Sequence, residues 1–353
     1  MITEGIQKLV EGNDLHYSEA RDVMKEIMSG GATDAQIASF LTALRMKGET
    51  TEEIAALSTT MKEFCHRIRP QVNGRLVDTC GTGGDRIKTF NISTTAAFVV
   101  AGAGIAVAKH GNRSFTSKSG SADVLERLGV NINLEPKIVE KTIEDVGIGF
   151  MFAPLFHPAM KYAIGPRKDI GVRTIFNILG PLSNPAGANG QVVGVYSREL
   201  VAPLANTLKK LGCEEAMVVH GLDGLDEIST IGETILAWLR GGEIQTVELM
   251  PRDFGMRQVR PEDIRGATPQ ENADISFKIL NGVSEGWDPK RDIVLVNAAA
   301  GIIVGGKAEN FEEGIQLARE SIESGAAYKR LKLLAKASNG DLSELERLES
   351  EYV

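Results

Sequence analysis

Apolar residues recur every three or four positions through the first 70 residues, which is the spacing of amphipathic helices. In segment 33–48, Thr33 and Gln36 have the spacing of a capping box, and Gly48 suits the end of the helix. A second box, Thr-x-x-Glu, starts the next helix at position 50. The pattern predicts a helical region at the start of the chain, and shorter helical pieces return between His157 and Pro181.

Elsewhere, short apolar runs alternate with helical periodicity. Strands are expected at Leu76–Asp78, Ile105–Ala108, Ile148–Phe152, Gln191–Val195, Ala216–Val219 and Ile293–Val296. Helices are expected at Thr94–Ala103, Ala122–Leu128, Lys137–Asp145, Leu200–Leu211, Gln270–Asn281 and Phe311–Ser324. This alternation is typical of an α/β fold with a mostly parallel central sheet flanked by helices. Ligands of such sheets bind beyond the carboxyl ends of the strands, so the loops there are the first candidates for a site.

Composition narrows the class of protein. A length of 353 residues suggests two domains, and 42% hydrophobic with 24% charged residues is ordinary for a globular chain. The net charge of −8 argues against general nucleic-acid binding, which depends on Lys and Arg. Three distant cysteines predict neither a disulfide framework nor a zinc site. The start of the chain does not resemble a secretory signal, and the longest small, apolar run, Ala96–Ala108, is shorter than the roughly 18 residues of a membrane span, so we expect a cytoplasmic protein.

A glycine-rich loop follows the first predicted strand. Residues 79–85 read Thr-Cys-Gly-Thr-Gly-Gly-Asp, and residues 91–95, Asn-Ile-Ser-Thr-Thr, then open an apolar helix in which Asn91 can act as the N-cap. Glycines at a strand end let the backbone approach a ligand and turn its N–H groups inward. The helix N-terminus adds unpaired N–H groups. Arg86 stands where a dinucleotide fingerprint needs its third glycine, so the pattern indicates another kind of phosphate-binding loop, with an ordinary glycine turn as the alternative.

The second predicted strand ends in a basic loop. Residues 109–114 read Lys-His-Gly-Asn-Arg-Ser, and residues 118–123, Lys-Ser-Gly-Ser-Ala-Asp, follow closely. Lysine provides a point charge for phosphate and arginine a bidentate fork. Because this loop leaves a neighbouring strand, we expect a second anion-binding surface beside the first.

Adjacent carboxylates follow a later strand, in the loop 220–229 that contains Asp226 and Glu227. Such a pair suits Mg²⁺, which takes oxygen ligands and often bridges to substrate phosphates. An acidic loop alone is weak evidence for a metal site. Beside two loops that are expected to bind phosphate, however, it would hold the cation that balances the phosphate charge. The Walker-like Gly301–Lys307 is rejected because Ala308 has no hydroxyl for magnesium and residues 298–305 are typical of a buried helix.

Together these motifs resemble the anthranilate phosphoribosyltransferases, which catalyse the second step of tryptophan biosynthesis. The resemblance runs nearly the whole chain, through residues 78–85, 91–94, 109–113, 118–125, 152–160, 173–182 and 224–227. It implies a helical domain, from residues 1–70 plus roughly 158–185, and an α/β donor-binding domain, from residues 71–157 and 186–353. It further implies a homodimer formed through the helical domain, and Mg²⁺-dependent transfer of the 5-phosphoribosyl group from 5-phosphoribosyl 1-pyrophosphate to anthranilate, with release of pyrophosphate.

The resemblance also implies site residues. The phosphoribosyl donor would be held by Gly81, Gly84, Asp85, Thr89, Asn91, Ile92, Ser93, Thr94, Lys109, His110, Gly111, Asn112, Arg113, Ser114, Phe115, Thr116, Ser117 and Ser121. Anthranilate would contact Gly81, Asn112, His157, Tyr162 and Arg167, and magnesium would meet Ser93, Asp226 and Glu227. Phe115 is bulkier than the small residue associated with many members. His110 is a candidate base, although a histidine in a polar loop more often forms hydrogen bonds.

The same motifs bear on two other functions. A pyrimidine nucleoside phosphorylase shares the fold, but the Gly-Thr-Gly-Gly-Asp loop and the acidic pair argue against it. A related fold that has lost catalysis and binds nucleic acid should carry basic stripes and eroded magnesium residues. This chain is acidic and keeps both carboxylates.

Overall fold

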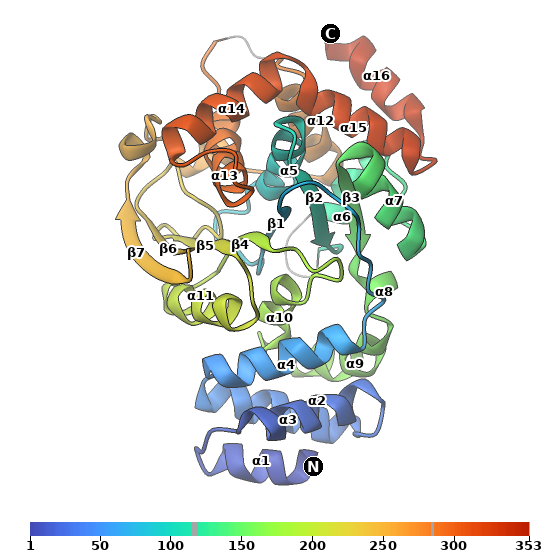
Figure 1. Cartoon of the computed structure of the whole chain (residues 1–353), viewed down its shortest axis with the longest axis vertical. Helices are drawn as coiled ribbons and strands as arrows, with labels where there is room; N and C mark the ends of the chain where they lie inside the picture. Colours follow the sequence, from blue (N-terminus) through green and yellow to red (C-terminus); the bar gives the residue numbers. More distant parts are fainter. Residues whose placement is uncertain (115–118, 284–285, 353) are drawn as a thin grey trace.

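The computed structural model places a bundle of helices against a larger α/β body (Figure 1), and it describes residues 1–114, 119–283 and 286–352. The chain starts in the bundle with α1 (Ile2–Val10), α2 (Tyr17–Met28), α3 (Asp34–Lys47) and α4 (Thr51–Glu63). Both predicted capping boxes are present, because the Thr33 and Thr50 hydroxyls accept the backbone N–H groups of Gln36 and Glu53. Gly48 follows α3 with a φ of +91°, as its predicted role requires.

A seven-stranded sheet forms the centre of the α/β body. Its order is β3-β2-β1-β4-β5-β6-β7, with parallel pairing from β3 to β5 and antiparallel pairing from β5 to β7. The strands are β1 (Leu76–Gly81), β2 (Ala106–Gly111), β3 (Ile148–Phe152), β4 (Gly190–Gly194), β5 (Glu215–Gly221), β6 (Thr234–Arg240) and β7 (Glu243–Leu249). The predicted α/β class with a mostly parallel sheet is confirmed. The parallel arrangement brings the carboxyl ends of β1, β2, β3, β4 and β5 to one edge.

Helices cover both faces of this sheet (Figure 1). On one face the apolar core includes side chains of α5 (Ile92–Gly102), α6 (Ser121–Arg127), α12 (Pro269–Leu280), α13 (Pro289–Val304), α14 (Phe311–Glu323), α15 (Ala326–Ala337) and α16 (Leu342–Tyr352). The other face packs against α7 (Pro136–Val146), α10 (Phe176–Leu182) and α11 (Val201–Lys210). Between β3 and α10 lie the short α8 (Ala153–Phe156) and α9 (Lys161–Ile170), while brief 3₁₀ turns occupy residues 158–160, 198–200, 251–254 and 261–264.

The returning helices join the two parts. α9 packs on α3 and α2 of the bundle (Figure 1), although more than 100 residues separate it from them in sequence. α10 packs on α4, and the Ser58 hydroxyl donates to the Leu182 carbonyl at 2.8 Å. One continuous apolar cluster therefore runs from the bundle through α10 to the sheet side chains Val193 and Val218.

One predicted strand is wrong. Ile293–Val296 lies inside α13, which packs across α5. A short apolar run fits a buried strand and a buried helix equally well, and here apolar residues, interrupted by Asn297, continue as far as Val304. The same helix contains the first part of the rejected Walker-like segment, as predicted. Within the described part of the chain, no helix has the length and apolar character needed to cross a bilayer.

Candidate active site

A cavity of about 410 Å³ opens at the carboxyl ends of β1 and β2, facing α9 and α10. Most of the predicted site residues line it, although they come from distant parts of the chain. They are Gly81, Gly84, Asp85, Thr89, Asn91, Ile92, Ser93, Thr94, Lys109, His110, Gly111, Asn112, Arg113, Ser114, Ser121, His157, Arg167, Asp226 and Glu227. Phe115, Thr116 and Ser117 lie outside the described residues.

The glycine loop after β1 is shaped for close backbone approach. Gly83 and Gly84 have φ values of +70° and +90°, which L side chains rarely adopt. The Gly83 N–H donates to Asp226 Oδ2 at 2.8 Å. A Cβ on Gly81 would stand 2.6 Å from the same carboxylate. A side chain at this position would therefore displace the Asp226 carboxylate from the end of β1.

Polar side chains hold the entry to α5 in place. Asp85 Oδ2 accepts the Thr89 N–H at 2.8 Å and its hydroxyl at 3.2 Å, which closes a turn before the helix. Asn91 occupies the N-cap position, as predicted, but its side chain does not cap the helix. Its Oδ1 instead accepts from Ser119 at 3.2 Å and from Asn272 at 3.1 Å. Asn91 thus connects the glycine loop to the basic loop, and the N-terminus of α5 faces the cavity.

Lys109 lies beneath the cavity floor with only 3% of its surface exposed. Its Nζ donates to the Thr79 carbonyl at 2.5 Å and lies 3.5 Å from Ser93 Oγ. Burial lowers the pKa of Lys109, an effect that the negative charge of the nearby Asp78 opposes. The cation therefore supplies positive potential to the loop ends of β1 and β2.

Arg113 is directed differently from its prediction as a phosphate fork. Its guanidinium makes a bidentate pair with Glu126, at 2.6 and 2.8 Å, and a further bond of 3.0 Å to Asp123. These carboxylates of α6 raise the pKa of Arg113. Arg113 still lines the cavity, but its charge is balanced within the protein. This pairing could not be predicted from the sequence, because α6 turns back toward the loop only in the fold.

The predicted carboxylate pair faces the cavity. Both side chains are half-buried, and desolvation raises the pKa of Asp226 to about 6, with Asp85 adding to the effect. Desolvation and the charge of Asp226 raise the pKa of Glu227. The Ser93 N–H donates to Glu227 Oε1 at 3.2 Å, so the pair also lies at the N-terminus of α5. Two adjacent carboxylates without a protein cation bonded to them, within the described residues, form a suitable environment for a divalent metal.

The small number of acidic side chains at this place bears on which metal could bind. Within residues 1–114, 119–283 and 286–352, no three His, Cys, Asp or Glu side chains form a complete metal-binding group. Asp226 and Glu227 alone could therefore provide only part of a coordination shell, and a metal bound there would need hydroxyl, water or substrate oxygens to complete it. Mg²⁺ is commonly held in this way, by one or two carboxylates plus substrate phosphates.

Two uncharged histidines lie side by side at the cavity, with ring centroids 5.0 Å apart. Burial lowers the pKa of His110 to about 4 and that of His157 to about 3. His110 Nδ1 donates to the Gly180 carbonyl at 3.2 Å, which leaves Nε2 as an unprotonated acceptor. The Nε2 atoms of both rings are buried without a hydrogen-bond partner in the described structure. Such atoms require a ligand group or water.

The helical side of the cavity combines one cation with apolar surface. Arg167 of α9 lies 5.2 Å from the Phe176 ring centroid, and no carboxylate of the described residues pairs with it. Met160, Ile164 and Phe176 also line this wall. These three were not predicted as site residues. In a short helix, the sequence does not distinguish an apolar residue that lines a cavity from one that packs in the hydrophobic core. Tyr162 is not part of the lining; its ring lies against Gly30 of the bundle, so the structure does not bring it to the cavity.

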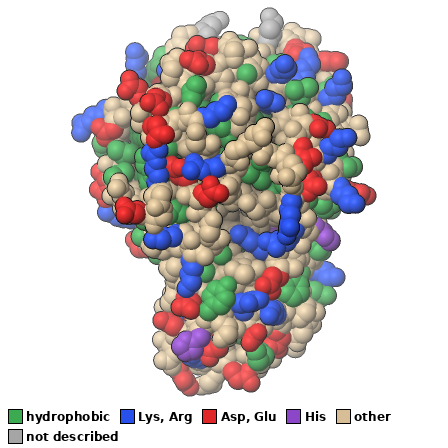
Figure 2. Space-filling view, viewed as in Figure 1, with side chains coloured by type: hydrophobic (Ala, Val, Ile, Leu, Met, Phe, Trp, Pro, Cys, Tyr) green, Lys and Arg blue, Asp and Glu red, His purple; other side chains and the backbone are tan. Residues whose placement is uncertain are grey.

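Arg173 is a further residue that sequence reasoning did not assign. Its guanidinium donates to the Gly84 carbonyl at 2.9 Å and stacks 4.3 Å from the Tyr196 ring centroid. It therefore reaches from the segment between α9 and α10 to the glycine loop. The only indication in the sequence that Arg173 belongs to the site was its place in segment 173–182, one of the motifs that carry the family resemblance. Figure 2 shows several Lys and Arg side chains along the narrowing between the larger and smaller parts of the molecule.

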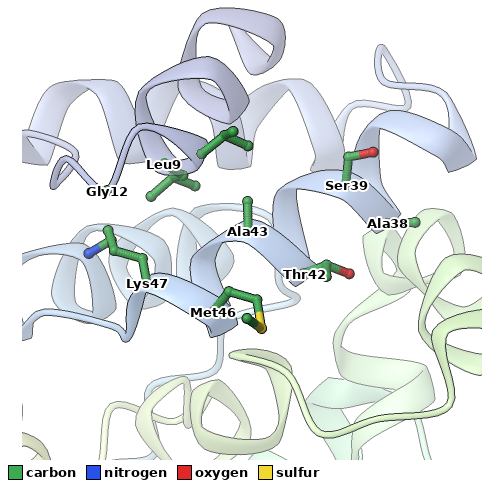
Figure 3. A pocket seen from close by; sticks show the side chains of 9 residues that line it. Leu9, Gly12, Ala38, Ser39, Thr42, Ala43, Met46 and Lys47 are labelled. Carbon is green, nitrogen blue, oxygen red and sulfur yellow. The ribbon is translucent and has the colours of Figure 1, made fainter.

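A second hollow lies in the bundle, away from these groups. Figure 3 shows it between α1 and α3, lined by small and apolar side chains with the hydroxyls of Ser39 and Thr42. Its volume is about 650 Å³. Lys47 borders it, but that ammonium is already paired with Glu53 at 2.8 Å. This hollow has no grouping of free polar atoms comparable to that at the strand ends.

Comparison with known proteins assigns the chain to a family. Residues 73–328 match the glycosyl transferase family, a/b domain, and residues 3–65 match its helical bundle domain. The anthranilate phosphoribosyltransferase of Acetivibrio thermocellus is 52% identical over 343 residues, 97% of this chain and 98% of that protein. The crystal structure of the Thermus thermophilus enzyme superposes with a TM-score of 0.89 at 41% identity, covering 95% of this chain and 99% of that one. The Saccharomyces cerevisiae enzyme in complex with PRPP and Mg gives 0.87 at 30% identity, covering 96% and 98%. The chain therefore belongs to the anthranilate phosphoribosyltransferases, within the glycosyl transferase family that combines a helical bundle domain with an α/β domain.

Proposed function

We propose that this protein transfers the 5-phosphoribosyl group from 5-phospho-α-D-ribose 1-diphosphate to anthranilate, releasing diphosphate, in the second step of tryptophan biosynthesis. The observation that supports this most is the division of one cavity into two unlike walls. Glycine-loop N–H groups, a helix N-terminus and a carboxylate pair form one wall. An arginine, two neutral histidines and apolar side chains form the other. The first wall suits a phosphorylated sugar with magnesium, and the second suits an aromatic carboxylate.

The donor would bind along the ends of β1 and β2. We assign the donor site to the glycine loop, the start of α5 and the basic loop, that is, Gly81, Gly84, Asp85, Thr89, Asn91, Ile92, Ser93, Thr94, the segment 109–117 and Ser121. Backbone N–H groups and Lys109 provide positive potential there, while Arg113 acts through its place in the loop because its charge is paired with Glu126. Phosphate recognition by a helix N-terminus and a glycine loop needs no broadly basic surface.

Magnesium would be held by Asp226 and Glu227 together with Ser93 and diphosphate oxygens, where it would neutralise the charge that develops on the leaving group. The yeast enzyme, in complex with PRPP and Mg, supports magnesium as the metal that accompanies the donor. The chain's own contribution is to aim both carboxylates at the cavity, which the N–H donors of Gly83 and Ser93 favour. These donors stabilise the anionic forms against the desolvation that raises their pKa.

Anthranilate would bind against the helical wall. Arg167 would pair with its carboxylate, and Met160 and Phe176 would pack against its ring. Gly81, Asn112 and His157 complete the contacts that we assign to it. The His110 Nε2 lone pair would accept a hydrogen bond from the amine. Because its pKa is near 4, His110 is a weak base, and we assign it to orientation of the amine.

This proposed arrangement matches what the chemistry requires. The arylamine of anthranilate is uncharged at neutral pH and already has a free lone pair, so attack on the sugar carbon needs no strong base. The larger requirements are alignment of the two substrates and stabilisation of departing diphosphate, which positioning and fixed positive potential supply.

Steady-state turnover with phosphoribosyl pyrophosphate and a panel of aromatic amines tests the proposal. We expect diphosphate release that depends on both Mg²⁺ and anthranilate, and is weak with aniline, which lacks the carboxylate. Phosphorolysis of uridine or thymidine, without turnover of anthranilate, would instead identify a nucleoside phosphorylase.

We propose further that the chain is a homodimer formed through the helical domain, which we assign to residues 1–70 plus roughly 158–185. Support comes from apolar side chains that α1 and α3 leave in solvent beside the hollow of Figure 3: Val10 is 69% exposed and Met46 is 82% exposed. A second copy of the same face would cover them, as a self-complementary interface requires.

Met46→Glu with Val10→Glu should therefore convert the protein from a dimer to a monomer of 38.0 kDa in light scattering after gel filtration. Two buried charges on each side would oppose association. Ile138→Glu is the matched control, because Ile138 is an exposed apolar residue of α7 in the other part of the molecule. A dimer that survives the double substitution would place the interface elsewhere.

A further inference from the structure

The acidic pair lies in a loop whose backbone is held at its ends. The loop connects β5 to β6, and Asp226 and Glu227 occupy its middle. Asp223 closes the loop near its start, since its carboxylate accepts the Leu225 N–H at 3.1 Å and the Ser229 hydroxyl. The Ser229 N–H donates to Thr234 Oγ1 at 2.9 Å near the start of β6. The peptide directly after the carboxylates is held from outside the loop.

That support comes from Asn297 of α13. Its Oδ1 accepts the Ile228 N–H at 2.9 Å, and its Nδ2 donates to the Ile228 carbonyl at 3.0 Å. The side-chain amide thus pairs with both backbone groups of one residue. Because the Ile228 N–H belongs to the peptide that begins at the Glu227 carbonyl carbon, this pairing fixes the peptide plane next to the acidic pair.

The buried surroundings of Asn297 hold its side-chain amide in one orientation. It is the one polar residue in the segment 293–304, and 2% of its surface is exposed. A buried amide is costly unless its hydrogen bonds are made. The remaining Nδ2 hydrogen donates to the Ile293 carbonyl at 2.8 Å, so both amide hydrogens are used. Rotation of the amide would break three bonds together, and α13 itself is fixed by its packing on α5.

We propose that Asn297 is a positioning residue for the metal carboxylates: by fixing the Ile228 peptide it holds Asp226 and Glu227 toward the cavity before a cation binds. This inference rests on the proposed function for the identity of the cation and substrate. The pairing of the Asn297 amide with the Ile228 peptide, called the clamp below, involves only residues of this chain and does not depend on the proposed function. It acts from behind the sheet edge, since Asn297 is not part of the cavity lining.

The effect should resemble loss of an outer-sphere partner of a metal ligand. Such substitutions typically weaken metal affinity by about 10- to 100-fold. In Asn297→Leu, which keeps the number and branching of the side-chain heavy atoms but has no polar atom, we expect the Mg²⁺ concentration for half-maximal activity to rise by about that factor. The KM for anthranilate should stay within about twofold, because the helical wall is untouched. A purely structural role would lower the amount of folded enzyme without changing its response to Mg²⁺.

Hydrogen exchange followed by mass spectrometry reads the clamp without substrate, metal or activity. In the wild type, amides of the loop 222–233 should exchange slowly, and in Asn297→Leu the Ile228 region should exchange faster. Mn²⁺ binding followed by electron paramagnetic resonance, with phosphoribosyl pyrophosphate present, gives affinity independently of turnover. The control is Ser321→Ala, which removes a buried 2.8 Å bond from α14 to the Val99 carbonyl in the same domain and touches no loop residue.

Asn297→Asp keeps the acceptor for the Ile228 N–H and loses the donor to its carbonyl, so it supplies the exchange measurement if the leucine variant does not fold. Unchanged exchange in the loop, or Mn²⁺ and Mg²⁺ responses equal to those of Ser321→Ala, would overturn the inference. Absence of phosphoribosyl transfer in the wild type would overturn the proposed function instead, and the exchange result would still stand for Asn297.

Discussion

Replacing both carboxylates of the proposed magnesium site, Asp226→Asn with Glu227→Gln, should lower kcat/KM by at least about a thousandfold while the protein stays folded. Loss of a single preorganised electrostatic group commonly costs about 10²- to 10³-fold. Here both carboxylates that would hold the cation are neutralised. The amide oxygens can still accept the N–H groups of Gly83 and Ser93, so the loop contacts survive. The measurement is turnover at increasing Mg²⁺, with circular dichroism as the check on folding.

Neutralising Asp226 alone, in Asp226→Asn, should raise the free energy of unfolding in the absence of Mg²⁺. The pKa of Asp226 is raised from 3.8 to about 6 in the fold, mainly by desolvation, so its ionised form disfavours folding above pH 6. This destabilisation fades as the pH falls from about 6 toward 4, at about 1.4 kcal/mol for each pH unit. We therefore expect the melting temperature of Asp226→Asn to exceed that of the wild type at pH 8, and the difference to shrink by pH 4.5.

Two results would contradict this view of the pair. Near-normal turnover of the double variant at saturating Mg²⁺ would show that the carboxylates do not hold the metal. A melting temperature below that of the wild type at pH 8 would show that they stabilise the fold. Asp223→Asn is a useful comparison, since Asp223 lies in the same loop but bonds to Ser229 and Leu225 rather than facing the cavity.

Local pattern and connectivity account for much of the fold that could be predicted. Capping boxes at Thr33 and Thr50 specify their helices through bonds spanning three residues, so sequence alone identifies them. The parallel strands could be predicted because short apolar segments alternate with helical segments along the chain. By contrast, β6 and β7 were missed, because β7 is exposed and charged and neither strand is followed by a helix. The segment 293–296 was misassigned because apolar character alone does not distinguish a buried strand from a buried helix.

For the candidate site too, some parts could be predicted from the sequence and others could not. Loops at the ends of neighbouring parallel strands must meet, so the glycine loop, the basic loop and Asp226–Glu227 could be placed together from sequence. Partners from elsewhere could not be identified. The charge of Arg113 is balanced by α6, and Asn297 supports the acidic loop from a helix that the sequence suggested was partly a strand. Such pairings depend on side-chain direction in three dimensions, which periodicity does not record.

Arg167→Ala should raise the KM for anthranilate by about 10- to 100-fold and change the KM for phosphoribosyl pyrophosphate much less. Hydrogen bonds to a charged partner contribute about 1.5–3 kcal/mol, which corresponds to that range. Arg167 lies on the helical wall, and burial lowers its pKa without removing its charge at neutral pH. It lacks a carboxylate partner among the described residues, so an anthranilate carboxylate would supply one that the protein does not.

The comparison that isolates this effect is Lys168→Ala, which removes the neighbouring exposed cation of α9 and should leave both KM values unchanged. Arg167→Lys separates charge from geometry: if the guanidinium binds a carboxylate with two parallel bonds, lysine should recover only part of the lost affinity. Because the partner is the substrate carboxylate, aniline should be used equally poorly by wild type and Arg167→Ala. Equal loss for both substrates, or an undiminished preference for anthranilate over aniline, would show that Arg167 does not bind the acceptor.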